Sequence, residues 1–151
     1  KNFSLYGERV GALSVVCRDA QEAQRVLSQL KVLIRSNYSN PPTHGAKAVA
    51  MVLADPALRA LWQKELAQMR QRIRRMRELL IAKLRDAGVR QDMSFIASQQ
   101  GMFSYSGLSA AQMQRLRSEF SVYGVDSGRI CVAAINERNV DHVAQAIARV
   151  M

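Results

Sequence analysis

Three arginines stand beside predicted loops or strand starts, where a side chain can reach a ligand: Arg9, Arg35 and Arg129. The planar guanidinium fork suits carboxylates and phosphates, which it can bind through two parallel hydrogen bonds. Any one of them, taken alone, is more often the partner of a surface ion pair. His44 and His142 belong to no arrangement typical of a hydrolase, and no glycine-rich phosphate loop is present. By themselves these residues indicate anion binding and nothing more specific.

Positive charge is concentrated in the segment RQRIRRMR, residues 70–77, in a chain of net charge +10. Apolar residues recur along this stretch at spacings of three and four, which is typical of one amphipathic helix with a basic outer face. They are Met69, Ile73, Met76, Leu80 and Leu84. A solvated face is favoured over a nucleic-acid stripe, because few aromatic side chains are available to stack on bases. No nucleic-acid partner is therefore expected.

The two cysteines, Cys17 and Cys131, lie in apolar runs and lack the spacing of a metal or redox motif. We expect buried free thiols in a reducing compartment, which indicates a cytoplasmic protein without a metal site. No apolar run approaches the roughly 18 residues that a membrane span needs. A soluble protein without a membrane partner is expected.

The first part of the chain predicts a buried strand, two helices and a loop between them. Residues 10–17 are apolar and β-branched enough for the strand. Asp19 is placed to cap a helix over 20–35, with its apolar residues turned inward. The loop 36–45 contains two consecutive prolines, which exclude helix. A short helix over 46–54 follows.

A long helix is predicted to join two lobes. An Asp-Pro pair opens it at residue 56, and its apolar repeat continues to Gly88, a natural stop. A helix over 56–87 would be about 48 Å long, longer than one small core requires. We therefore place a domain boundary within it, between 1–68 and 69–151.

The second lobe predicts short strands alternating with helices. Strands are expected at 94–96, 101–105 and 129–133. Ser-x-x-Gln forms a capping box for a helix over 109–120, and Asn136 is expected to cap the last helix. Short connections between strands and helices indicate a compact α/β lobe.

Four segments resemble, in the same order, segments of the aspartate and aromatic amino acid aminotransferases. They are KNFSLYGERVG, IRSNYSNPPTHGA, GMFSYSGL and SGRICVA. This family uses pyridoxal phosphate (PLP) on the type I fold. The resemblance implies an α/β chain made of the end of the large, PLP-binding domain and most of the small domain. It also implies that the chain starts at the cofactor lysine, with other active-site residues upstream.

The resemblance implies a role for each candidate residue. Lys1 would form the Schiff base with PLP and move the proton at the substrate Cα, because an amine can do both. Arg9 would bind the cofactor phosphate, unless it pairs with the neighbouring Glu8. Arg129 would hold the substrate α-carboxylate, and Arg35 would reach across a dimer interface to the distal carboxylate. A basic helix end explains Arg35 equally well.

Three further residues match less specific positions of the family. Ser39 and Asn40 would lie near the cofactor phosphate of the neighbouring subunit. Phe103 resembles an aromatic residue beside the substrate side chain, although core packing accounts for it equally well.

The function that the resemblance implies is transamination by a homodimer with shared active sites. The segments FSLYGERVG and GMFSYSGLSAAQ look closer to the aromatic branch, so tyrosine or phenylalanine with 2-oxoglutarate is expected, with aspartate also accepted. An aspartate aminotransferase is the first alternative. The second is a non-catalytic fragment that dimerises or binds anions through a basic helix. That helix would bind through Arg72, Arg74 and Arg75.

Overall fold

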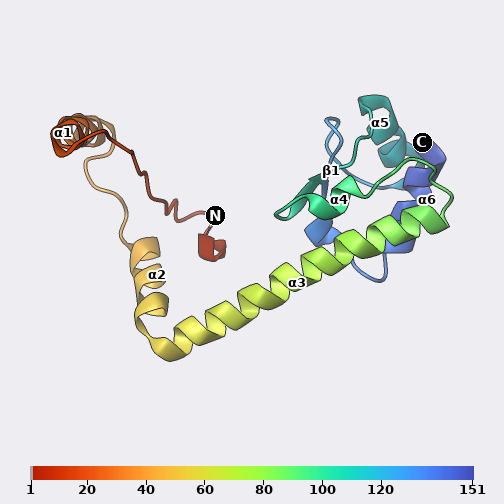
Figure 1. Ribbon diagram of the computed structural model, residues 1–151, viewed down its shortest axis with the longest axis horizontal. Helices are drawn as coiled ribbons and strands as arrows, with labels where there is room; N and C mark the ends of the chain where they lie inside the picture. Colours follow the sequence, from red (N-terminus) through yellow and green to blue (C-terminus); the bar gives the residue numbers. More distant parts are fainter. Residues whose placement is uncertain (1) are drawn as a thin grey trace. The chain divides into compact units, whose positions relative to one another are not determined.

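The computed structural model describes residues 2–151 and divides into two compact units, Lys1–Gln63 and Lys64–Met151. The division falls inside one continuous helix, α3 (Figure 1). The elements of the first unit are η1 (Asn2–Ser4), α1 (Ala20–Asn37), α2 (His44–Ala54) and the start of α3 (Pro56–Asp86). None of the described helices is long and apolar enough to cross a membrane.

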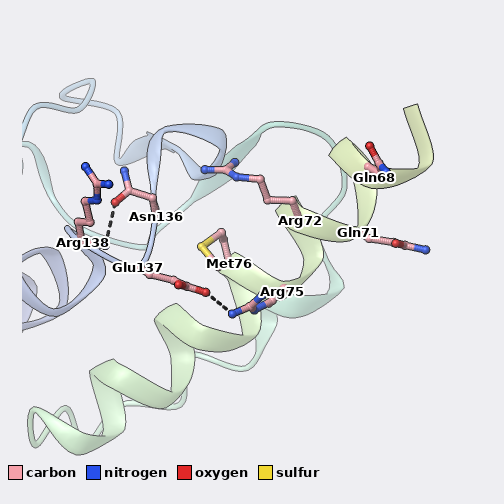
Figure 2. Close-up of a pocket in the computed structure, with 8 residues that line it drawn as sticks. All are labelled: Gln68, Gln71, Arg72, Arg75, Met76, Asn136, Glu137 and Arg138. Carbon is pink, nitrogen blue, oxygen red and sulfur yellow. Dashed lines mark hydrogen bonds and ion pairs between the residues drawn. The ribbon is translucent and has the colours of Figure 1, made fainter. Parts of the chain in front are cut away.

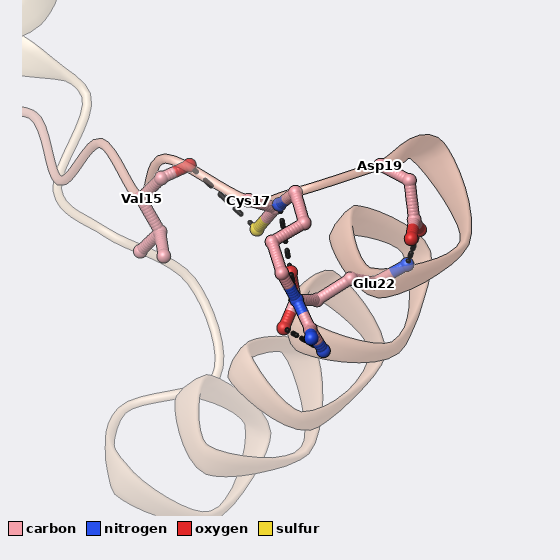
Figure 3. Close-up of polar contacts among 5 residues, drawn as sticks. Val15, Cys17, Asp19 and Glu22 are labelled. Atoms are coloured by element: carbon pink, nitrogen blue, oxygen red, sulfur yellow. Dashed lines mark hydrogen bonds and ion pairs between the residues drawn. The ribbon is translucent and has the colours of Figure 1, made fainter.

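Helices α1 and α3 begin where the sequence predicts, because side chains cap their free backbone N–H groups, whereas α2 begins at His44, inside the predicted loop. The Asp19 carboxylate accepts a hydrogen bond of 2.7 Å from the Glu22 backbone N–H at the start of α1 (Figure 3). At the start of α3 the Asp55 carboxylate accepts from the Ala57 N–H at 2.8 Å. Each cap satisfies a donor that has no partner inside its own helix.

The prediction of a buried strand over 10–17 is wrong. These residues have no regular secondary structure, and Leu13, Val15 and Val16 are exposed. A strand needs a neighbour for its backbone hydrogen bonds, and no described segment pairs with this one. The expected buried thiols are wrong too. Cys17 and Cys131 are both free but half-buried, and the Cys17 Sγ lies 3.9 Å from the Val15 carbonyl (Figure 3).

The apolar side of α1 is exposed as well. Leu27 and Leu33, which the sequence predicts to face inward, are 51% and 63% exposed, and no residue of this fully described helix is buried. Apolar residues in the first half of α3 are exposed too, among them Leu58 and Met69. An amphipathic repeat predicts which face can be buried, but burial itself needs a second element against that face.

The second unit has a well-defined apolar core against the end of α3. The largest fully buried apolar side chains are Leu80, Leu84, Ile96, Met113, Leu116, Val132, Val140 and Ile147. They belong to α3, α4 (Phe95–Ser98), α5 (Ala110–Phe120), η2 (Val132–Ala134) and α6 (Val140–Val150). The apolar residues of α3 thus change from exposed to buried along one helix.

The described strands, β1 (Phe103–Tyr105) and β2 (Arg129–Cys131), form an antiparallel pair. Their register pairs Phe103 with Cys131, Ser104 with Ile130 and Tyr105 with Arg129. Alternate residues point to opposite faces of a sheet, so Ser104 and Ile130 are buried while Phe103, Tyr105 and Arg129 are exposed.

Local turn chemistry explains where the second unit departs from prediction. Residues 94–96 enter helix α4 instead of a strand, because the Asp92 carboxylate accepts from the Ser94 N–H at 2.9 Å and turns the backbone. The strand that begins at Arg129 ends at Cys131. The last helix starts after Asn139 rather than at Asn136. The capping box of α5 and the stop at Gly88 are confirmed.

The basic stretch of α3 is not simply a solvated face. Arg77 is 2% exposed, and its burial lowers the pKa of the guanidinium below its ordinary value. Arg72 donates hydrogen bonds to the backbone carbonyls of Ala133 and Ile135, at 3.1 and 2.8 Å. These arginines therefore tie α3 to segments far away in the sequence.

Replacing Leu80, which has no exposed surface, tests the role of the α3 core. Leu80→Ala should lower the free energy of unfolding by about 3 kcal/mol, because the core around it cannot fully close the cavity. Urea unfolding of the purified protein measures this. The control is Glu78→Ala, exposed on the same helix, which should change stability by less than about 0.5 kcal/mol. Equal losses from the two changes would contradict the assignment of this core.

Candidate active site

The arginine expected to bind phosphate has a side chain that is free within the described structure. Lys1 itself lies outside the described residues. Arg9 ends a turn over residues 6–9 with a left-handed backbone (φ 54°), and it is exposed. Its guanidinium forms no hydrogen bond or ion pair with any residue that the structure describes. The Glu8 carboxylate, the alternative partner, instead lies 3.0 Å from His44 Nδ1.

Gly45 sets how closely the segment that carries Arg9 can approach α2. It is buried, and a Cβ atom there would lie 2.4 Å from Val10 Cγ2 and 2.7 Å from Glu8 Cβ. Any side chain would push that segment away. Sequence reasoning missed Gly45 as a positioning residue, although a glycine inside the first turn of a helix costs helix stability and invites a packing explanation.

The end of α1 brings two other candidates together. Arg35 Nη1 hydrogen-bonds the Ser39 hydroxyl. Ser39 has a left-handed backbone (φ 66°), and its N–H reaches back to the Ile34 carbonyl at 2.9 Å. Asn40 follows, with its N–H bonded to the Tyr38 carbonyl at 2.8 Å. The hydroxyl is a neutral partner, so the charge of Arg35 is not neutralised by this contact.

In the second unit the structure brings Arg129 and Phe103 together on the exposed face of the β1–β2 pair. The Arg129 Cζ lies 4.9 Å from the centre of the Phe103 ring, within the range of a cation–π interaction. Phe103 is 45% exposed, so core packing does not account for it. Arg129 forms no ion pair or hydrogen bond through its guanidinium with the described residues. Arg129 is thus an exposed guanidinium beside an exposed aromatic ring.

Gly128 fixes the backbone in front of Arg129. Its φ of 83° is in the region that favours glycine, and a Cβ atom there would lie 2.7 Å from the Leu108 carbonyl oxygen. The Gly128 carbonyl accepts hydrogen bonds from the Ser106 N–H at 2.9 Å and the Ser106 hydroxyl at 2.7 Å. The glycine of the SGR segment is thus required by its fit against Leu108.

A cavity of about 740 Å³ lies elsewhere in the second unit, between α3 and the turn before α6 (Figure 2). It is lined by Gln68, Gln71, Arg72, Arg75, Met76, Asn136, Glu137 and Arg138, and by none of the residues predicted to bind PLP or the amino-acid substrate. Arg72 binds backbone carbonyls, and Arg75 pairs with Glu137. Arg72 and Arg75, two of the three residues of the proposed basic binding face, are therefore also structural contacts of the second unit.

The comparisons with known proteins identify the class. The model of the family "Aminotransferase class I and II" matches residues 1–147, and this chain belongs to that family. It is 56% identical over its whole length to an aspartate aminotransferase of Pseudomonas aeruginosa, and 55% identical to an aromatic-amino-acid aminotransferase of Escherichia coli. The chain spans 38% of the length of each of these curated relatives.

Solved structures agree on the fold. The aromatic-amino-acid aminotransferase of Burkholderia pseudomallei, a structure covalently bound to pyridoxal phosphate, is 64% identical, with a TM-score of 0.91. That match covers 98% of this chain and 37% of the other. A mitochondrial aspartate aminotransferase of Trypanosoma brucei matches with a TM-score of 0.91 at 47% identity. The chain therefore has the fold of the corresponding part of these aminotransferases, as the four sequence segments predicted.

Alanine at Gly128 tests whether the close fit before Arg129 is real. Gly101→Ala is the matched control, because Gly101 has a similar φ of 82° but open space around the position of a Cβ atom. The control should lose about 1 kcal/mol of unfolding free energy from the left-handed backbone alone. Gly128→Ala should lose about 3 kcal/mol, because the clash with Leu108 adds to that strain. Urea unfolding measures both, and equal losses would contradict the packing argument.

Proposed function

We propose that the protein is a PLP-dependent aminotransferase that moves an amino group between an aromatic or dicarboxylic L-amino acid and a 2-oxo acid such as 2-oxoglutarate. The observation that carries this proposal is the Arg129–Phe103 pair, a guanidinium without an anionic partner among the described residues beside an exposed ring on paired strands. A guanidinium binds a carboxylate bidentately, and a neighbouring ring suits an apolar or aromatic side chain. Membership of the family supports the same reaction.

The residues of the first unit fit the cofactor by their donor chemistry. Arg9 is exposed and has no partner among the described residues, so its guanidinium is available to bind a phosphate. Gly45 lets the segment that carries it rest against α2. Lys1 would hold PLP through its amine, and Ser39 would contribute a hydroxyl near a phosphate. When bound, PLP supplies an electron sink for the electrons of the broken Cα–H bond.

The remaining steps belong to side chains of this chain. Arg129 would bind the substrate α-carboxylate and so hold the Cα–H bond in the orientation that reaction requires. Lys1 would then take the proton from the substrate Cα and deliver it to the C4′ carbon of PLP. Arg35 would bind the distal carboxylate of a dicarboxylic substrate, with its Ser39 contact giving way to that stronger charged partner.

We also propose the assembly and organisation expected of such an enzyme. It would be a homodimer in the cytoplasm in which Arg35 serves the neighbouring active site. Residues 1–68 would be the end of the PLP-binding domain and 69–151 the small domain. Two free cysteines support the reducing compartment. The 64% identity to the Burkholderia aromatic enzyme favours the aromatic branch, while the 56% identity to an aspartate enzyme supports acceptance of dicarboxylates.

Removal of the Lys1 amine tests the reaction class. Lys1→Ala should lower the transamination rate with tyrosine and 2-oxoglutarate by more than about 10³-fold, because the proton at Cα loses its base. Glutamate formation measures the rate, and borohydride reduction followed by peptide mapping should place PLP on the Lys1 peptide of the wild type. Lys31→Ala, an exposed lysine on α1, is the control. Wild-type turnover in Lys1→Ala would refute the assignment.

Two arginine variants separate the proposed carboxylate sites. Arg129→Leu should raise the KM for both tyrosine and aspartate by about 10²-fold, because each loses its charge-assisted hydrogen bonds to the α-carboxylate. Arg35→Leu should lower kcat/KM for aspartate by a similar factor and leave tyrosine little changed. Each variant controls for the other in steady-state assays. Equal effects of Arg35→Leu on both substrates would contradict its role.

A further inference from the structure

We infer that Arg77, which is buried beneath β1, is a positioning residue for the substrate-carboxylate site. The inference rests on the proposed function, since it concerns how Arg129 and Phe103 are held for substrate. Arg77 lies on α3, is 2% exposed, and is far from both residues in the sequence. It reaches the site through the backbone that carries Phe103.

The Arg77 guanidinium bonds four acceptors, one in α4, one between α4 and β1, and two in β1. Nη1 donates to the Ile96 carbonyl at 3.0 Å and to the Ser104 hydroxyl. Nη2 donates to the Gly101 carbonyl at 2.8 Å and to the Phe103 carbonyl at 3.0 Å. All four acceptors are neutral, and no ion pair to Arg77 exists among the described residues. A planar fork can reach four divergent acceptors at once, which a single ammonium group cannot do in the same geometry.

This contact matters because β1 has little else to fix it. The strand is three residues long, and strands of that length paired with one neighbour are marginal by themselves. On its other side the Gln99 side chain bonds the Tyr105 backbone, at 2.7 Å to the N–H and 3.0 Å to the carbonyl. Arg77 adds two further hydrogen bonds to β1, at the Phe103 carbonyl and at the hydroxyl of the buried Ser104.

The position of Phe103 follows from that anchor. Its carbonyl is held by Arg77 and its ring lies 4.9 Å from the Arg129 Cζ. β1 and β2 share one ladder, so a shift of β1 moves both the ring and the strand from which Arg129 projects. A buried charge without a counter-charge is unfavourable, and an apolar side chain would fill a core position at less cost. We explain the arginine at this position by its hydrogen bonds, which fix the backbone of β1 at Phe103 and Ser104.

The test compares Arg77→Lys with Arg70→Lys in the purified, PLP-loaded enzyme. Arg70 lies seven residues earlier on α3 and is exposed. Arg77→Lys should raise the KM for tyrosine and for 2-oxoglutarate about tenfold. The kcat per PLP-loaded site should change much less. PLP content should stay the same, since Lys1 and Arg9 belong to the other unit. Arg70→Lys should match the wild type.

Each outcome decides the question. A lower melting temperature in Arg77→Lys with an unchanged KM would show a purely structural role and overturn the inference. If Arg77→Lys yields no PLP-loaded protein, Ser104→Ala, which removes one acceptor, decides instead: a raised KM supports the inference and an unchanged KM overturns it. A wild type that transaminates none of the substrates refutes the proposed function, and the inference falls with it. An active wild type with an unaffected Arg77→Lys refutes the inference alone.

Discussion

Burial of the last turns of α3 is the constraint on which the second unit depends. Leu80 and Leu84 lose their contact with water against α4, α5 and α6, and the neighbouring Arg77 is taken into the same interior. A guanidinium in such a place has to find acceptors, because an unsatisfied buried donor costs more than a hydrogen bond gains. Its acceptors lie on the segment before β1 and on β1 itself, so the packing of the helix and the position of the strand are coupled.

The arginines of this chain differ in function according to their partners rather than their sequence surroundings. Arg72 binds backbone carbonyls, Arg75 binds Glu137, and Arg77 binds β1. In contrast, Arg9 and Arg129 have exposed guanidinium groups without anionic partners among the described residues. Free charge is what an anionic substrate or cofactor requires. Arg9 and Arg129 are therefore available to an anionic ligand, while Arg72, Arg75 and Arg77 of the basic helix also have structural contacts.

A glycine packs closely against, or lies within, each of the segments that carry Arg9 and Arg129. Gly45 and Gly128 lie where a Cβ atom would meet a neighbouring segment at 2.4 and 2.7 Å. In each case a close approach of backbone segments is possible because no side chain intervenes. Both glycines belong to segments that resemble the aminotransferases, and the close contacts give a packing reason for their presence.

The sequence by itself determined the features that depend on neighbours within about four residues. Asp19 and Asp55 cap their helices, Ser109 forms a capping box, and Gly88 ends α3, because each uses local backbone hydrogen bonds. The resemblance to the family was also readable from the segments alone. Local rules failed at 94–96, where the Asp92 turn outweighed strand propensity.

The tertiary structure decided which apolar and charged faces are buried. Residues 10–17 have the composition of a buried strand yet are exposed, and α3 carries one continuous repeat that is exposed at Leu58 and buried at Leu80. Arg77 stands in a run of surface-like arginines, yet its acceptors lie 19 to 27 residues away. Periodicity states which side chains share a face. Burial and long-range hydrogen bonding depend on which distant segment reaches that face, and no local pattern encodes it.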